Sequence, residues 1–177
     1  MIVAAAALAA APTEQAILRP ADGAILDPGP LSIVARGKAQ LRVDGKQVAA
    51  ASPGPGAVAA TVNPAPGLHE LAFGDRKIRF FVGASEAPAG FRAYRAHPPA
   101  AAGCETCHAV KDGAWGFRGA TLAASCFGCH DAGRFPEPHS HNATVLGECQ
   151  LCHDPHGSTA KFHLKMDRET ACKQCHG

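Results

Sequence analysis

The sequence predicts a small antiparallel β-sandwich followed by a loop-rich region with short helices. Two observations support this fold class. From Thr13 to Gly83, short runs of strand-forming residues alternate with turn formers, and no cysteine occurs. Beyond residue 90 the composition changes sharply, because all 8 cysteines and nine of the 10 histidines lie there. The chain therefore divides into two parts with different ways of stabilising a fold.

Seven short segments of the first part are candidate strands. The Asp44-Gly45 pair between two of them predicts a two-residue hairpin. Strands at this spacing in about 70 residues are typical of a small sandwich, and the pattern resembles a minimal bacterial immunoglobulin-like module. The expected strands are Ala16–Arg19, Leu31–Ala35, Gln40–Val43, Lys46–Ala49, Ala57–Val62, His69–Phe73 and Lys77–Val82.

The N-terminal part shows no catalytic constellation. Its aspartates follow turn patterns, and His69 begins an expected strand, so both are interpreted as structural. Residues 1–12 resemble a signal peptide or its remnant, although the apolar run is short and carries no basic residue before it. We therefore expect a β domain over residues 13–83, a linker over 84–90 and a second domain over 91–177.

The second domain contains one five-residue pattern four times, Cys-x-x-Cys-His. This pattern is the attachment sequence of haem c, in which both thiols bond to the haem vinyl groups and the histidine binds iron. Zinc sites and disulfides are the alternatives, but neither explains a histidine directly after every cysteine pair. The four copies are Cys104, Cys107 and His108; Cys126, Cys129 and His130; Cys149, Cys152 and His153; Cys172, Cys175 and His176.

Four covalently bound haem c groups dominate so short a domain. The first cysteines of successive motifs are 22, 23 and 23 residues apart, which divides the domain into two dihaem modules at about 97–130 and 141–177. About 87 residues cannot build an ordinary core around four such cofactors. We therefore expect the haems to form the core, and the haem-free domain to be largely unfolded.

Residues 141–176 resemble the multihaem cytochromes that carry a doubled Cys-x-x-Cys-His motif, including the stretch Asp154-Pro155-His156-Gly157-Ser158. Residues 97–130 resemble them less closely, because Ala109-Val110-Lys111 replaces the Asp-Pro-His element. The resemblance implies three distal iron ligands and leaves one position open in the first module. The implied ligands are His97, His141 and His156; His139 is the expected substitute for the fourth, and His163 is expected to pack.

The spacing of His153 and His156 limits which haem His156 serves. Three residues span at most ~10 Å, too little for the chain to round a porphyrin edge and return to the same iron. His156 is therefore expected to bind a haem other than the one attached at Cys149 and Cys152. A ligand from an adjacent subunit, as in filament-forming cytochromes, is the alternative for an open position.

Histidine on both faces of every iron leaves no site for a substrate. We therefore expect an electron-transfer protein with low-potential haems, without catalytic residues and with the β domain used for docking or assembly. Haem c is attached on the outer side of the cytoplasmic membrane, so we expect the protein in the periplasm or outside the cell. The partners are expected to be a redox donor and acceptor, with a homo-oligomer or filament possible. The formal charge of +2 falls to about −2 once propionates and ferric irons are counted, which gives no reason to expect nucleic-acid binding.

Two other functions remain open. A multihaem reductase acting on a small nitrogen or sulfur species would need one haem with an open axial position. A structural or adhesive β module with redox-sensing haems would instead make the N-terminal domain the main functional part. A high-spin band in the oxidised spectrum favours the first of these.

Overall fold

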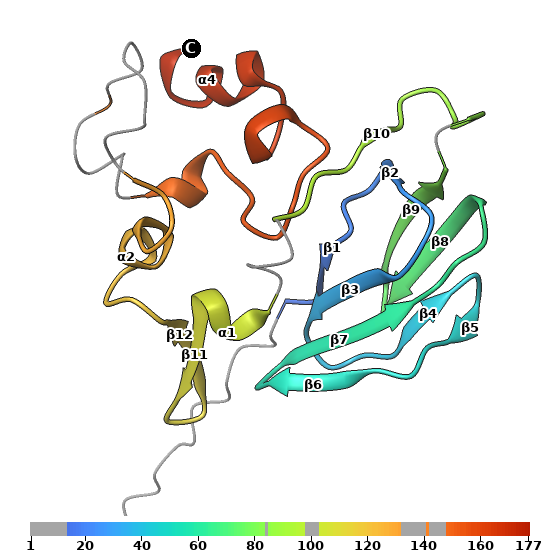
Figure 1. Cartoon of the computed structure of the whole chain (residues 1–177), viewed down its shortest axis with the longest axis horizontal. Helices are drawn as coiled ribbons and strands as arrows, with labels where there is room; N and C mark the ends of the chain where they lie inside the picture. The colour runs from blue at the N-terminus through green and yellow to red at the C-terminus, as the bar shows by residue number, and fades with distance from the viewer. Residues whose placement is uncertain (1–13, 84, 98–102, 132–140, 142–147) are drawn as a thin grey trace, which may run out of the picture.

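The computed structural model describes residues 14–83, 85–97, 103–131, 141 and 148–177. Two β-sheets occupy the N-terminal half, and a loop-rich region with short helices follows them (Figure 1). The predicted fold class is confirmed. The predicted signal peptide lies outside the described residues. None of the described helices combines the length and the apolar character that a bilayer span requires.

The first sheet has four strands in the order β1-β3-β7-β6, all antiparallel. They span Ala16–Arg19 (β1), Leu31–Arg36 (β3), Ala57–Val62 (β7) and Ala51–Gly54 (β6). The second sheet has six strands in the order β10-β2-β9-β8-β4-β5. They span Arg92–Ala93 (β10), Ala24–Leu26 (β2), Arg76–Val82 (β9), Gly67–Phe73 (β8), Leu41–Val43 (β4) and Lys46–Gln47 (β5).

All seven predicted segments contain a strand, and the predicted hairpin is confirmed. Asp44 (φ 51°) and Gly45 (φ 76°) both have the left-handed backbone that a type I′ turn requires. Three strands of these two sheets were not predicted: β2, β6 and β10. Pro53 in β6 is typical of a turn, but β6 lies at a sheet edge, where proline removes no ladder hydrogen bond.

The sandwich is not wholly antiparallel. Strand β2 pairs in parallel with β9, and β10 pairs in parallel with β2. The reason is a change of sheet early in the chain, because β1 joins the first sheet and β2 the second. Strand β2 therefore does not pair with β1 or β3, its neighbours in sequence, and it lies between β10 and β9 instead.

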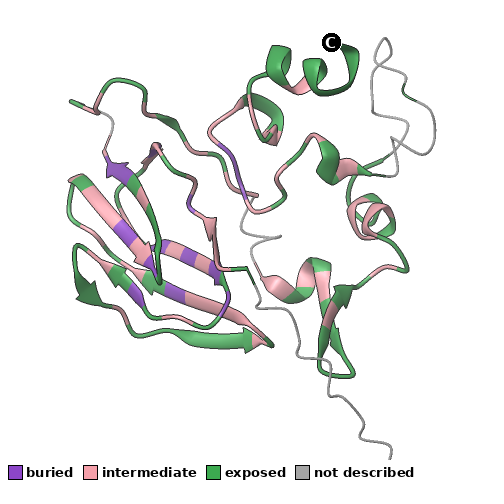
Figure 2. Ribbon diagram, turned by 180° about the vertical axis from the view of Figure 1, so that it is seen from behind, coloured by how far each residue is buried: buried purple, intermediate pink, exposed green. Residues whose placement is uncertain are grey.

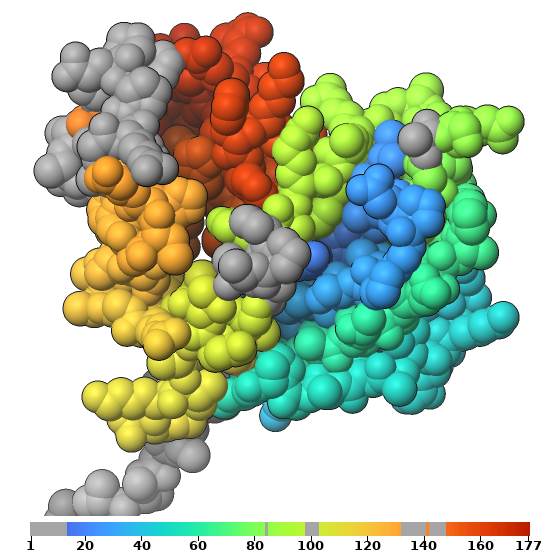
Figure 3. All heavy atoms as spheres, viewed as in Figure 1, coloured from blue at the N-terminus to red at the C-terminus, as the bar shows by residue number. Residues whose placement is uncertain are grey.

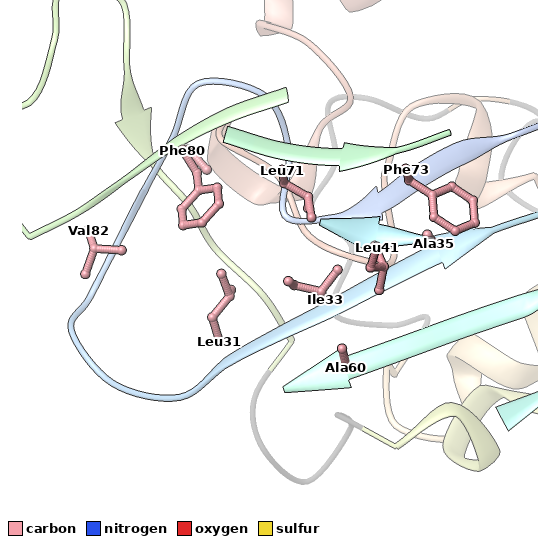
Figure 4. Close-up of a cluster of buried hydrophobic side chains, with 10 residues drawn as sticks. Leu31, Ile33, Ala35, Leu41, Ala60, Leu71, Phe73, Phe80 and Val82 are labelled. Atoms are coloured by element: carbon pink, nitrogen blue, oxygen red, sulfur yellow. The ribbon is translucent and has the colours of Figure 1, made fainter. Parts of the chain in front are cut away.

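The apolar core lies between the two sheets (Figure 4). Leu31, Ile33 and Ala35 alternate along β3 with less buried residues, so one face of the strand points inward. Phe73 and Phe80, from the second sheet, are 0% exposed and supply the largest buried side chains. The remaining core residues are Ala24, Leu41, Ala60, Leu71 and Val82.

The C-terminal region has little core of its own. Among its described residues only Gly157 and Ser158 are buried, and Figure 2 shows a single purple segment there. Short elements connected by loops make up the region. They are α1 (Cys104–Cys107), β11 (His108–Lys111), β12 (Ala114–Phe117), α2 (Leu122–Phe127), η3 (Cys149–Leu151), η4 (Lys161–His163) and α4 (Arg168–His176).

The β11–β12 hairpin was not predicted, although its turn carries a recognisable signal. Asp112 (φ 52°) and Gly113 (φ 74°) form the same type of turn as the Asp-Gly pair of the β-sheets. The hairpin occupies the place where the Asp-Pro-His element is missing from the first module. It therefore gives that module a local structure that the second module lacks.

Candidate functional site

Each Cys-x-x-Cys-His motif forms a helical turn. The amide of His130 donates to Cys126 O at 2.9 Å and that of His153 to Cys149 O at 3.0 Å, which closes the turn around the two cysteines. The first motif lies in α1 and the fourth in α4. Residues three apart share one face of a helical turn, so both thiols of a motif point toward the same space. One planar group can therefore bond to both.

Thiols from three motifs lie close together. Burial, together with the nearby thiols of Cys149 and Cys107, raises the pKa of Cys126 to about 11. No disulfide joins any of the eight cysteines. The attachment edges of the first three motifs therefore converge on one region rather than being spread along the chain.

Three pairs of histidine rings lie near one another, although the residues of each pair are far apart in the sequence. His108 and His156 have ring centroids 6.3 Å apart and an interplanar angle of 6°. His97 and His130 are 6.3 Å apart at 78°, and His141 and His176 are 6.0 Å apart at 43°. Each pair combines one motif histidine with one histidine from outside the motifs.

These spacings fit an iron between the rings. Two imidazoles that bind opposite faces of one metal through Nε2, at about 2 Å each, have centroids about 6 Å apart. Ring stacking without a metal is closer, as in the His97–His163 pair at 4.9 Å and 28°. The three pairs therefore have the centroid separation that two imidazole ligands of one iron would need.

Comparison with protein families identifies the same region. The family model described as "Doubled CXXCH motif" matches residues 97–135 and 141–177. Residues 97–177 are a doubled-motif multihaem cytochrome c region. No curated protein and no solved structure matches the chain significantly. The C-terminal region is hereafter called the cytochrome region and the two sheets the β region; cytochromes of the c type carry covalent haem c and are generally extracytoplasmic.

Backbone carbonyls fix the orientation of several histidines in the cytochrome region. Nδ1 of His97 donates to Pro155 O at 2.8 Å, and Nδ1 of His153 to Phe162 O at 2.8 Å. Nδ1 of His108 lies 3.3 Å from Gly116 O. A carbonyl only accepts, so the ring proton sits on Nδ1 and the lone pair of Nε2 is available for a metal.

The distal candidate His156 has a carboxylate in place of a carbonyl. Its Nδ1 lies 3.5 Å from Asp154 Oδ1, and its amide donates to the same oxygen at 2.9 Å. Burial raises the pKa of Asp154, but the hydrogen bonds and the charge of His156 outweigh it, so the net pKa is lowered. The carboxylate thus stays ionised beside the ring and holds the proton on Nδ1.

A strained turn supplies the carbonyl that orients the ring of His153. Phe162 (φ 60°) and His163 (φ 56°) are consecutive non-glycine residues in the left-handed region, which costs about 1 kcal/mol each. The turn aims Phe162 O at Nδ1 of His153 and places the His163 ring on His97. Among the described residues no histidine ring stands opposite His153 at axial spacing. His139, the expected fourth distal ligand, lies outside the described residues.

Sequence reasoning missed the contacts made by Tyr94 and Trp115. Tyr94 Oη donates to His156 O at 2.8 Å, and Trp115 Nε1 donates to Pro55 O at 2.7 Å. A polar tip on a half-buried aromatic is a general signal for such a bond, but its partner cannot be read from the sequence.

Proposed function

We propose that the protein is a periplasmic or extracellular electron-transfer cytochrome with four haem c groups, each iron bound by two histidines. The observation that supports it best is the set of three facing ring pairs at 6.0–6.3 Å. A protein with both axial positions taken has no place for a substrate at iron. The proposed role is therefore electron transfer without bond chemistry.

The ring pairs support a pairing of ligands across the motifs. His108 and His156 would hold the haem of Cys104 and Cys107, which we call the first haem. His97 would serve the motif histidine His130, and His141 would serve His176. The distal ligand of the first haem then comes from the loop that follows the third motif. Such crossed ligation ties the haems to one another and keeps the gaps between their edges small.

Haem c supplies reversible one-electron chemistry at iron. Paired thiols of the chain would tether the group, and the histidines whose Nδ1 is bonded to a carbonyl would offer Nε2 to its iron. Methionine, which raises the potential of His/Met cytochromes, is not well placed to compete. Met166 Sδ already accepts a hydrogen bond from Gln174 Nε2 at 3.2 Å. We therefore propose low potentials at all four centres.

The remaining centre, for which no ring pair is described, is the haem attached at Cys149 and Cys152 of the third motif. We propose His139 as its distal ligand, opposite His153, because the ring of His163 is already stacked on His97. An adjacent subunit is the other source of a ligand, and it would make the centre depend on assembly. The β region would serve docking or assembly with donor and acceptor proteins.

The test is a count of centres in the purified holoprotein. Mass spectrometry should find four haems per chain, and EPR of the oxidised protein should find four low-spin irons. Fewer than four haems contradicts the proposed cofactor number. A high-spin signal from one iron contradicts the electron-transfer proposal and favours a reductase. The iron bound by His153 is the first candidate for that open position.

A further inference from the structure

The cytochrome region touches the β region on both sides of the first haem's ligand pair. On the His108 side, the indole of Trp115 meets the imidazole edge-on, with centroids 5.4 Å apart at 73°. The same indole donates Nε1–H to Pro55 O, in the turn after β6. In Figure 3 the yellow atoms of the β11–β12 hairpin lie against the teal atoms of β6 and β7.

The fit of Trp115 on β6 is tight. A Cβ placed on Gly54 would lie 2.4 Å from Cζ2 of Trp115, well inside van der Waals contact. Any other residue at this position would push the indole away from the sheet. Trp115 also pairs with Val110 across the hairpin, whose first residue is His108. The β region therefore limits where the hairpin, and with it the proximal ring, can lie.

On the His156 side the contact runs through Tyr94. This residue follows β10, packs against the apolar core and donates its hydroxyl to His156 O. The next residue, Arg95, exchanges two backbone hydrogen bonds with Ser158, at 2.8 and 2.9 Å. A Cβ on Gly157 would lie 2.1 Å from Tyr94 Oη, so the loop and the tyrosine are closely fitted.

The buried residues of the cytochrome region lie at its contact with Tyr94 and Arg95. Gly157 and Ser158 are the buried residues among the described part of the cytochrome region, and both lie at this junction. The two rings that the contacts support are nearly parallel, at 6°, whereas the His97–His130 pair is nearly perpendicular, at 78°. The pair held from both sides by the β region is therefore the most closely aligned of the three.

We propose that Trp115 and Tyr94 are positioning residues through which the β region orients both axial histidines of the first haem. This inference rests on the proposed ligation of that haem by His108 and His156. It gives the β region a structural part in one redox centre, beyond any role in docking. It also sets the first haem apart from the other three, whose ligands make no such pair of contacts among the described residues.

The test uses EPR and redox titration of three full-length holoprotein variants. In low-spin ferric haem the angle between the two imidazole planes controls the g values, so EPR reports ring orientation directly. Trp115→Phe keeps an aromatic ring on His108 but loses the bond to Pro55, and Tyr94→Phe loses only the hydroxyl. Gly54→Ala changes only β6, and it affects the first haem by displacing the indole of Trp115.

We expect each variant to keep four haems and to shift the g values and midpoint potential of one and the same centre. His69→Phe is the matched control, because it removes bonds to Asp44 and Ala65 that stay within the β region while keeping the ring stacked on Phe80. The control should leave all four centres unchanged.

Two results would overturn the inference. Unchanged g values in all three variants mean that the β region does not orient these rings, and equal shifts in every centre mean that the effect is general destabilisation. If Trp115→Phe fails to assemble, Gly54→Ala and Tyr94→Phe still decide the question. Wild-type protein with a high-spin first haem would instead refute the ligation on which the inference rests, so the two failures are distinguishable.

Discussion

Replacing His156 by alanine should open one axial position and no other. The ring of His156 faces His108 at 6.3 Å, and alanine has no atom that reaches an iron between them. The loop itself should stay in place, because Tyr94 and Asp154 bond the carbonyl and amide of His156, which alanine retains. Asp154 lies beside Nδ1, away from the iron-binding nitrogen, so it does not replace the lost ligand.

The magnitude follows from the number of motifs. Wild-type reduced protein should bind no carbon monoxide, and the variant should bind about one molecule per chain, a quarter of its haem. The assay is titration of the reduced holoprotein with carbon monoxide, followed by the Soret band and normalised to total haem. EPR of the oxidised variant should show one low-spin signal fewer.

His69→Ala is the control, because its ring bonds Asp44 and Ala65 in the β region. It should bind no carbon monoxide. If the His156 variant also binds none, His156 is not an axial ligand and the axial interpretation of the ring spacings is wrong. Uptake of two or more molecules per chain would show that the loop supports other centres as well.

Three further predictions concern other positions. His163→Leu should keep four low-spin irons by EPR and bind no carbon monoxide, because its ring stacks on a neighbouring histidine at 4.9 Å; a new high-spin signal would make it a ligand. Phe80→Ala should lower the free energy of unfolding of the β region by about 3–5 kcal/mol in denaturant titrations, because Phe80 is 0% exposed. Leu68 is half-exposed, so Leu68→Ala should lower the free energy of unfolding far less; equal losses for the two variants would contradict the assigned core. Burial raises the pKa of Asp44, but hydrogen bonds from His69 and a backbone amide outweigh it and lower the net pKa. The stability this gives is present above about pH 4 and is lost as the pH falls further, so the advantage of wild type over Asp44→Asn in thermal melts should shrink there; an advantage that grows on acidification would refute the sign.

Much of the local structure follows from short stretches of sequence. The Asp44-Gly45 hairpin was predicted because the left-handed turn depends only on those two residues and the strands beside them. The spacing of each cysteine pair likewise fits one helical turn whatever surrounds it. Strand β6 was missed for the opposite reason, since Pro53 is acceptable only because the strand lies at an edge.

The arrangement of the site needed more than local patterns. The sequence identified which histidines follow a cysteine pair and, through a family resemblance, which others to consider as ligands. It did not show that the ring of His156 faces His108, because these residues meet only when separate segments fold together. The position of His139 opposite His153 stays a prediction.

Sequence alone determined the attachment chemistry, the number of motifs and the division into two parts, because each depends on residue type and spacing within a few positions. Only the tertiary structure decided which rings face one another and where the β region meets the cytochrome region. Trp115 and Tyr94 show the reason. Each side chain donates a hydrogen bond to a backbone carbonyl far away in the chain, and any residue can supply a carbonyl. The side chain of the partner residue therefore cannot be recognised in the sequence. Packing decides where the β region and the cytochrome region contact each other.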